Sequence, residues 1–171
     1  MFNFSFLITN ILAVSIYSFS IVSIDGNAIS LGQFKGKKML FVNTATGSQY
    51  AQQYAGLEKL YQQYKDSLVI IAFPSNDFGN EGNADNTIQT MVTSKYHPSY
   101  ILASKLSVKG AGISPLFKWL AESTQNGRID DPVIGDFCKY LIDGTGNIKG
   151  VFAGSVDPMD SVLQNAITDP N

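Results

Sequence analysis

The chain has only one cysteine, Cys138, and one histidine, His97, among its 171 residues. A single cysteine cannot form an intramolecular disulfide or a Cys-x-x-Cys redox pair. Two such residues are also too few for a structural zinc site, which takes four ligands. Cys138 is interpreted as a small buried side chain in a strand. The alternative is a relocated redox cysteine, and its cycle would need an external thiol, since the chain has no second one.

Two other chemistries have weak support. His97 could serve as the base for a serine such as Ser48, but Ser48 does not lie in a G-x-S-x-G nucleophile elbow. The glycine pair at 144–146 is followed by a predicted strand and not by a helix. It is therefore a turn, and not a loop that cradles a phosphate at a helix N-terminus.

The composition excludes further classes of protein. Hydrophobic residues make up 44% of the chain, which is enough to form a core and argues against disorder. The net charge is −2 and no basic run is present, so nothing favours a nucleic-acid partner. No metal or organic cofactor is expected.

Strand and helix patterns alternate along the chain and predict one α/β domain over residues 16–171. A hairpin over 17–23 with a turn at 25–27 is followed by a buried strand at 39–42. A helix over 49–64 and a second buried strand at 68–73 come next. Further helices are predicted around Ile88 to Val92, after Ser114-Pro115, and from Asp157-Pro158 onward, and a hairpin pairs 137–142 with 148–152. We expect a mixed central sheet with helices on both faces and an N-terminal β-hairpin.

Residues 1–15 differ from the rest of the chain. They are apolar, interrupted by Asn3, Ser5, Thr9 and Asn10, and too short for a membrane span. Their length suits the apolar part of a signal peptide, although the basic n-region of such peptides is absent. The segment is either a signal peptide, which would make the protein secreted or periplasmic, or an N-terminal extension of a cytoplasmic protein. No later stretch is expected to span a membrane.

Five segments, in order, resemble glutathione peroxidases. They are Phe41–Thr46 with Gln53–Leu57, Phe73–Gly79, Val108–Gly110, Ser114–Phe117 and Phe137–Asp143. The corresponding family patterns are V-N-V-A-S-x-C-G-x-T-x-Q-Y-x-x-L, F-P-C-N-Q-F-G, V-N-G, the P-L-Y helix and W-N-F-x-K-F-L-V-D. The resemblance covers the chain from Tyr17 through the last helix. It implies a thioredoxin-like fold and the family activity, thiol-dependent reduction of hydroperoxides in the oxidative-stress response.

At the catalytic positions that this resemblance indicates, this chain has other residues than the family has. The family has a cysteine or selenocysteine where this chain has Ser48, and a glutamine where it has Asp77. The family's tryptophan and asparagine correspond to Gly135 and Asp136. The cysteine of the second segment corresponds to Ser75. A serine hydroxyl stays protonated at neutral pH and has no sulfenic-acid step, so natural loss of the peroxidase site is expected.

If the family geometry is kept, Ser48, Asp77 and Asp136 converge at one helix N-terminus. Two neighbouring carboxylates would repel and raise one pKa. The pair could then accept a proton or form a weak divalent-cation site. The alternative is that both carboxylates point into water on loops and cap backbone N–H groups.

Two functions from different classes remain open. The first is an active peroxidase, whose partners would be glutathione or thioredoxin as thiol donor. The second is a peroxidase-like scaffold that binds a protein or small molecule, with the weak cation site as one option. The substitutions at Ser48, Asp77, Gly135 and Asp136 favour the second.

Overall fold

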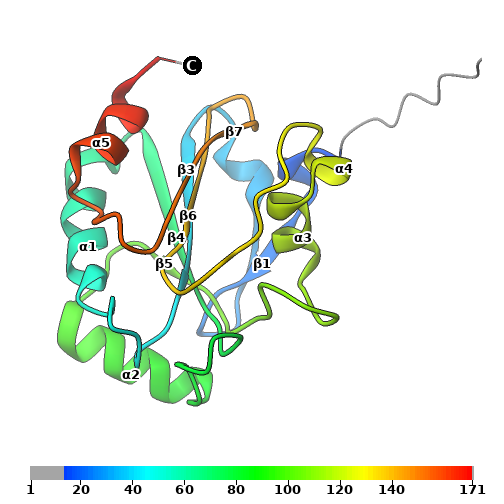
Figure 1. Cartoon of the computed structure of the whole chain (residues 1–171). Helices are drawn as coiled ribbons and strands as arrows, with labels where there is room; N and C mark the ends of the chain where they lie inside the picture. The colour runs from blue at the N-terminus through cyan, green and yellow to red at the C-terminus, as the bar shows by residue number, and fades with distance from the viewer. Residues whose placement is uncertain (1–13, 171) are drawn as a thin grey trace, which may run out of the picture.

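The computed structural model describes residues 14–170, and its centre is a five-stranded mixed sheet with the order β5-β4-β3-β6-β7. Strands β3, β4 and β5 are parallel, β6 runs antiparallel to them, and β7 pairs antiparallel with β6. A separate antiparallel hairpin, β1 with β2, precedes the sheet (Figure 1). The strands are β1 (Ser20–Val22), β2 (Ala28–Ser30), β3 (Lys38–Thr44), β4 (Leu68–Pro74), β5 (Ile101–Leu102), β6 (Lys139–Ile142) and β7 (Ile148–Phe152).

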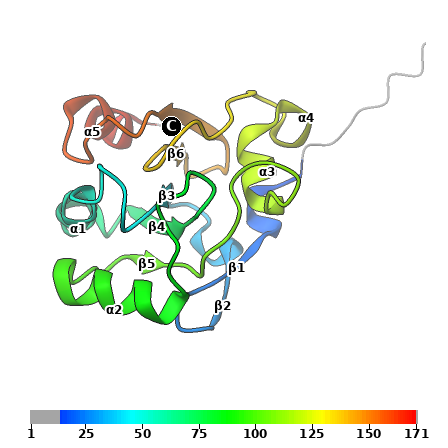
Figure 2. The ribbon, with the colours of Figure 1, turned by 60° about the horizontal axis from the view of Figure 1, so that its bottom comes forward.

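Helices cover both faces of this sheet (Figure 2). One face carries α1 (Gln53–Tyr64), α2 (Asp85–Tyr96) and α5 (Ser161–Thr168), and the other carries α3 (Pro115–Ala121), α4 (Ser123–Asn126) and the hairpin. Short 3₁₀ turns, Ile16–Ser18 and Leu31–Phe34, flank the hairpin.

The central strand β3 divides its side chains between the two cores. Leu40 and Val42 pack on the α1 side, and Met39 and Phe41 pack on the α3 side, all fully buried. This is the near-continuous apolar pattern of a strand that is covered on both faces. The expected mixed sheet with an N-terminal hairpin is confirmed.

Several boundaries differ from the sequence-based ones. The first long helix begins at Gln53 and not at residue 49, because 49–52 form turns. The last helix begins at Ser161, because the side chain of Asp160 accepts a hydrogen bond from Val162 N at 2.8 Å. β6 begins at Lys139. Neither β5 nor α4 was predicted, since two and four residues are too few to show a periodicity.

The N-terminal segment 1–15 lies largely outside the described residues, so its two interpretations stay open. Within residues 14–170, no helix has the length and apolar character needed to cross a membrane.

Candidate functional site

A pocket of about 460 Å³ lies where the carboxyl ends of β3 and β4 meet the chain that enters β6. In parallel arrangements this edge of a sheet is where ligands bind. The pocket is lined by Ser48, Gln49, Tyr50, Phe78, Asn80, Ile134, Gly135 and Asp136. None of these side chains is basic, so the lining carries one negative charge, that of Asp136.

Ser48 lies in the turns between β3 and α1. It is 8% exposed, and its hydroxyl accepts a hydrogen bond from Tyr50 N at 3.2 Å. The turn is tied to the loop after β4, because Gly47 N donates to Asn80 O at 3.0 Å. A Cβ at Gly47 would lie 2.8 Å from that carbonyl oxygen, so this close approach requires glycine. The histidine is not near enough to line the pocket: His97 is the exposed residue that ends α2. Nothing in the lining could act as a base for Ser48 in the manner of a histidine.

Asp136 is the buried carboxylate of the pocket, at 5% exposure. Its Oδ2 accepts a hydrogen bond from Asn80 Nδ2 at 2.6 Å. Its Oδ1 is buried and has no hydrogen-bond partner among the described residues. Buried carboxylates usually have both oxygens satisfied, so Oδ1 is an unsatisfied acceptor, shielded from solvent, on a residue that lines the pocket.

The structure holds the Asp77 carboxylate elsewhere. Its Oδ2 accepts hydrogen bonds from Val108 N at 2.5 Å, Ser107 Oγ at 2.9 Å and Lys109 N at 3.1 Å. Burial raises the pKa of the Asp77 carboxyl, but these bonds outweigh it and hold that pKa below its usual value. Asp77 does not line the pocket with Ser48 and Asp136.

The expectation that three side chains converge is therefore wrong for Asp77. Its carboxylate instead caps backbone N–H groups of a loop, as the alternative interpretation predicted. Its pKa is lowered by hydrogen bonds and is not raised by a second carboxylate. Across residues 14–170, no cluster of three or more His, Cys, Asp or Glu side chains could hold a metal ion. The cation site built from Ser48, Asp77 and Asp136 thus lacks one of its ligands.

Glu81 is a buried acid that sequence reasoning missed. It is fully buried and accepts hydrogen bonds from Thr46 N at 2.6 Å and Thr46 Oγ1 at 2.9 Å. It thereby holds the turn that carries Ser48. The residue lies in an irregular loop, where no periodicity distinguishes a buried glutamate from an exposed one.

The segment that presents Asp136 has a constrained backbone. Phe137 has φ of 61°, a conformation that bulky residues rarely adopt. Two contacts with Asn43 at the end of β3 hold it: Phe137 N donates to Asn43 O at 2.6 Å, and Asn43 Nδ2 donates to Gly135 O at 2.9 Å. Lys139 adds a third, because its Nζ donates to Phe137 O at 2.8 Å.

The only thiol of the chain is not in this pocket. Cys138 is 3% exposed and belongs to the core between the sheet and α3. Its position agrees with the interpretation as a small packed side chain, but it lies one residue before β6 and not in the strand.

The family model for "Glutathione peroxidase" matches residues 16–121, more than half of the chain. The chain belongs to the glutathione peroxidase family. A "Glutathione peroxidase" of Lactococcus lactis subsp. cremoris is 34% identical over 85% of this chain and 93% of its own length. A "Glutathione peroxidase homolog BsaA" of Staphylococcus epidermidis is 35% identical over 84% of this chain and 92% of its own length.

Solved structures establish the thioredoxin-like fold of this family member. The crystal structure of Trgpx in apo form superposes with a TM-score of 0.70 and 30% identity, over 93% of this chain and 99% of the other. A thioredoxin-family thiol:disulfide interchange protein from Chlorobium tepidum TLS superposes with a TM-score of 0.65 over 91% of this chain and 97% of its own. At 18% identity the second match supports the fold alone.

Proposed function

We propose that this glutathione peroxidase family member does not reduce hydroperoxides through a thiol and retains the pocket at Ser48 as a binding site. The observation that carries the proposal is that a hydroxyl, and not a thiol, lies in the pocket. The pocket holds the hydroxyl of Ser48, and the only thiol, Cys138, is buried in the core.

The chemistry of the family explains why this matters. Peroxide reduction starts with a thiolate, whose sulfur attacks the O–O bond, takes up one oxygen as a sulfenic acid and releases water. A reactive cysteine needs access and a lowered pKa. The resemblance assigns that position to Ser48, whose alcohol stays protonated. It assigns the family's glutamine, tryptophan and asparagine to Asp77, Gly135 and Asp136, so four positions differ together.

The test is hydrogen peroxide consumption with glutathione and then thioredoxin as donor. We expect the wild type and Cys138→Ala to match the uncatalysed rate. A Ser48→Cys variant should gain one oxygen atom per chain from peroxide, trapped at residue 48 by a sulfenic-acid reagent and located by mass spectrometry. This gain would show that the pocket admits peroxide and that a thiol at residue 48 can react with it.

Turnover by the wild type would overturn the proposal. If Cys138→Ala abolished it, Cys138 would be the nucleophile and the protein an active peroxidase with a thiol donor. If Cys138→Ala retained it, the reaction would not depend on a thiol of the chain.

The pocket lining favours a ligand that brings a hydrogen-bond donor or a positive charge. Asp136 supplies a carboxylate with an unpaired oxygen, no basic group lines the pocket, and Tyr50 and Phe78 add aromatic rings. Benzylamine, benzyl alcohol and benzoate compare these charges at similar size. We expect saturation-transfer NMR to rank the amine first and benzoate last, and Asp136→Asn to remove the preference. Asp66→Asn, at an exposed site on the chain between α1 and β4, is the matched control. Equal binding of all three probes would contradict this ligand class.

The N-terminal segment is proposed, as an alternative to a retained extension, to be a signal peptide ending near residue 15. The intact mass of the protein isolated from its native host distinguishes the two. A mass that includes Met1 would exclude cleavage, and with it the export of the protein by that route.

A further inference from the structure

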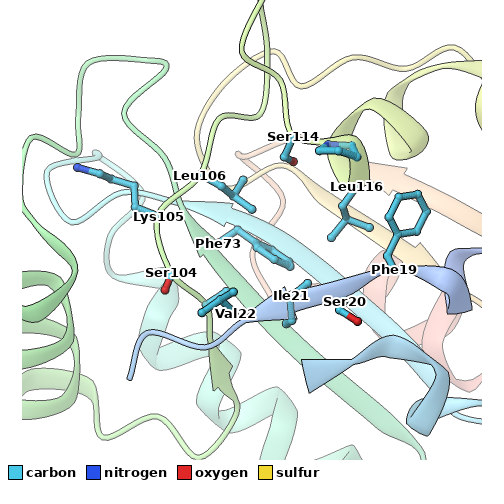
Figure 3. Close-up of a pocket in the computed structure, with 12 residues that line it drawn as sticks. Phe19, Ser20, Ile21, Val22, Phe73, Ser104, Lys105, Leu106, Ser114 and Leu116 are labelled. Atoms are coloured by element: carbon cyan, nitrogen blue, oxygen red, sulfur yellow. The ribbon is translucent and has the colours of Figure 1, made fainter. Parts of the chain in front are cut away.

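A second cavity, of about 310 Å³, lies between β1, the chain after β5 and the first turn of α3 (Figure 3). It shares no lining residue with the pocket at Ser48. Figure 3 shows the Phe73 ring at its centre, with Leu106 and Leu116 on one side of the ring and Ile21 on the other. Phe19, Val22, Ala103 and Pro115 complete the apolar lining.

The one charged group of the lining is directed away from the cavity. Lys105 is the only charged residue there, and its Nζ donates to Asn83 O at 2.6 Å. Figure 3 shows its side chain pointing away from Phe73. The hydroxyl of Ser104 donates to Ser23 O at 3.0 Å, and that of Ser114 accepts the α3 cap bond from Phe117 N at 3.3 Å. A buried ionic group would find no partner here, and such burial is strongly unfavourable.

The size of the cavity limits the ligand. An engineered apolar cavity of about 150 Å³ binds benzene, and this cavity is about twice as large. It is also at the lower end of the range for small-molecule sites, roughly 300 to 1,000 Å³, which are mostly apolar with few polar groups. Val22, an exposed apolar side chain, lies at the rim and would be covered by an occupant.

We propose that this cavity binds a small, uncharged, apolar molecule about the size of a bicyclic aromatic ring system. The site is independent of Ser48, so it does not depend on the function proposed above. Its apolar walls provide the binding free energy by removing the ligand's surface from water. Its lack of a free charge excludes fatty acids and other amphiphilic anions in favour of neutral molecules of the same length.

The probe is N-phenyl-1-naphthylamine, an uncharged dye whose fluorescence rises in apolar surroundings. We expect saturable binding to the full chain, with competition by 1-decanol at least tenfold stronger than by decanoate at neutral pH. Val22→Trp places a bulky group at the rim and should weaken dye binding at least tenfold. Val162→Trp is the matched control, because Val162 is a comparably exposed valine on α5, and it should bind like the wild type.

A second variant keeps the test valid if Val22→Trp does not fold. Leu106→Trp fills the cavity from the opposite wall and should also reduce dye binding, with circular dichroism confirming the fold. The proposal fails if the dye does not saturate, or if both variants bind it like the wild type. It also fails if decanoate competes as well as decanol and Lys105→Met abolishes that competition, which would indicate an anionic ligand. A dimer in sedimentation that Val22→Trp dissociates would identify a second copy of the chain as the occupant instead.

Discussion

Asp136 and Lys139 lie three residues apart on the same stretch of backbone, and their charges meet different surroundings. Asp136 faces the pocket, with one oxygen on Asn80 and the other unpaired. Lys139 is fully buried in β6, and its Nζ reaches only the carbonyl oxygen of Phe137 among the described residues. A buried ammonium with a single neutral acceptor is poorly compensated for the loss of water. Burying each of these charges with so few hydrogen-bond partners therefore lowers the stability of the folded protein.

Burial lowers the pKa of Lys139 to about 8, from an ordinary value of 10.5. A pKa that is lower in the folded state means that the folded protein releases this proton first, so unfolding takes up a proton between these two values. Stability should therefore rise with pH across that interval, by an amount on the order of 3 kcal/mol. Urea unfolding between about pH 7.5 and 9.5 measures about 2 kcal/mol of this rise, before tyrosine ionisation in the unfolded chain at about pH 10 opposes it.

Lys139→Met should flatten this dependence, because the methionine carries no proton to exchange. Lys59→Met, at an exposed site on α1, is the control and should keep the wild-type slope. The same slope in Lys139→Met and in the wild type would mean that another group titrates in this interval.

The sequence predicted which residue types lie near the pocket, but it could not predict which side chains point into the pocket. Ser48 and Asp136 could be assigned through the motifs around them. Asp77 shares its motif with Phe78, which does line the pocket, yet its carboxylate turns to the segment 107–109. That choice depends on free N–H groups from a distant loop, which no local pattern records. Glu81 escaped prediction for the same reason.

At the level of elements, buried strands and capped helices were predictable, because apolar runs and cap residues are local signals. β3 and β4 have continuous apolar sequences, and Ser114 precedes Pro115 as a cap precedes a first helical residue. The ends that tertiary contacts decide were predicted less well. α1 begins four residues late because the turns that present Ser48 come first, and β6 begins after Phe137, whose backbone is left-handed.

Asp77 connects the loop after β4 to the segment after β5, and Asp77→Asn tests that connection. The carboxylate accepts three hydrogen bonds, two of them from backbone N–H groups. An amide oxygen accepts them more weakly, so we expect a loss of about 1 to 2 kcal/mol in the free energy of unfolding near pH 7. The magnitude allows for the partial exposure of Asp77.

The stabilisation by the Asp77 carboxylate depends on pH. Because the pKa of Asp77 is lowered in the folded state, its contribution is present above the ordinary value of 3.8 and is lost as the pH falls through the folded value. The difference between wild type and Asp77→Asn in urea unfolding should therefore shrink in acid. Asp66→Asn should show no such difference. Titration of Ca²⁺ or Mg²⁺ should give the same heat with the wild type and Asp77→Asn, since this carboxylate already has its partners.

At the scale of the molecule, one sheet separates two apolar cores, and the two sites occupy different places on it. The Ser48 pocket lies at the carboxyl ends of β3 and β4, and the apolar cavity lies on the α3 face beside the hairpin. The segment that follows β5 lies between them: Leu106 lines the cavity, and residues 107–109 hold Asp77, whose neighbour Phe78 lines the Ser48 pocket. The framework of a fold and the chemistry of its sites are separate properties, because one fold can carry different sites.

Hydrogen bonds connect the end of α5 to the start of the central strand β3. These two parts of the chain are far apart in sequence. Lys38, the first residue of β3, donates from Nζ to Ile167 O and to Asp169 O, both at 2.6 Å. These carbonyls belong to the last turn of α5 and the residue after it, where unpaired acceptors favour a cation. Lys149 also donates to Asp169 O, so Lys38→Met should loosen the end of α5 without freeing it. It should cost about 1 kcal/mol in the free energy of unfolding, and speed amide hydrogen exchange in 161–168 before it changes exchange in β3. Lys37→Met is the matched control, because Lys37 is the exposed neighbour, and should leave both quantities unchanged. If exchange rose equally in β3 and α5, Lys38 would stabilise the sheet as a whole and not the attachment of its last helix.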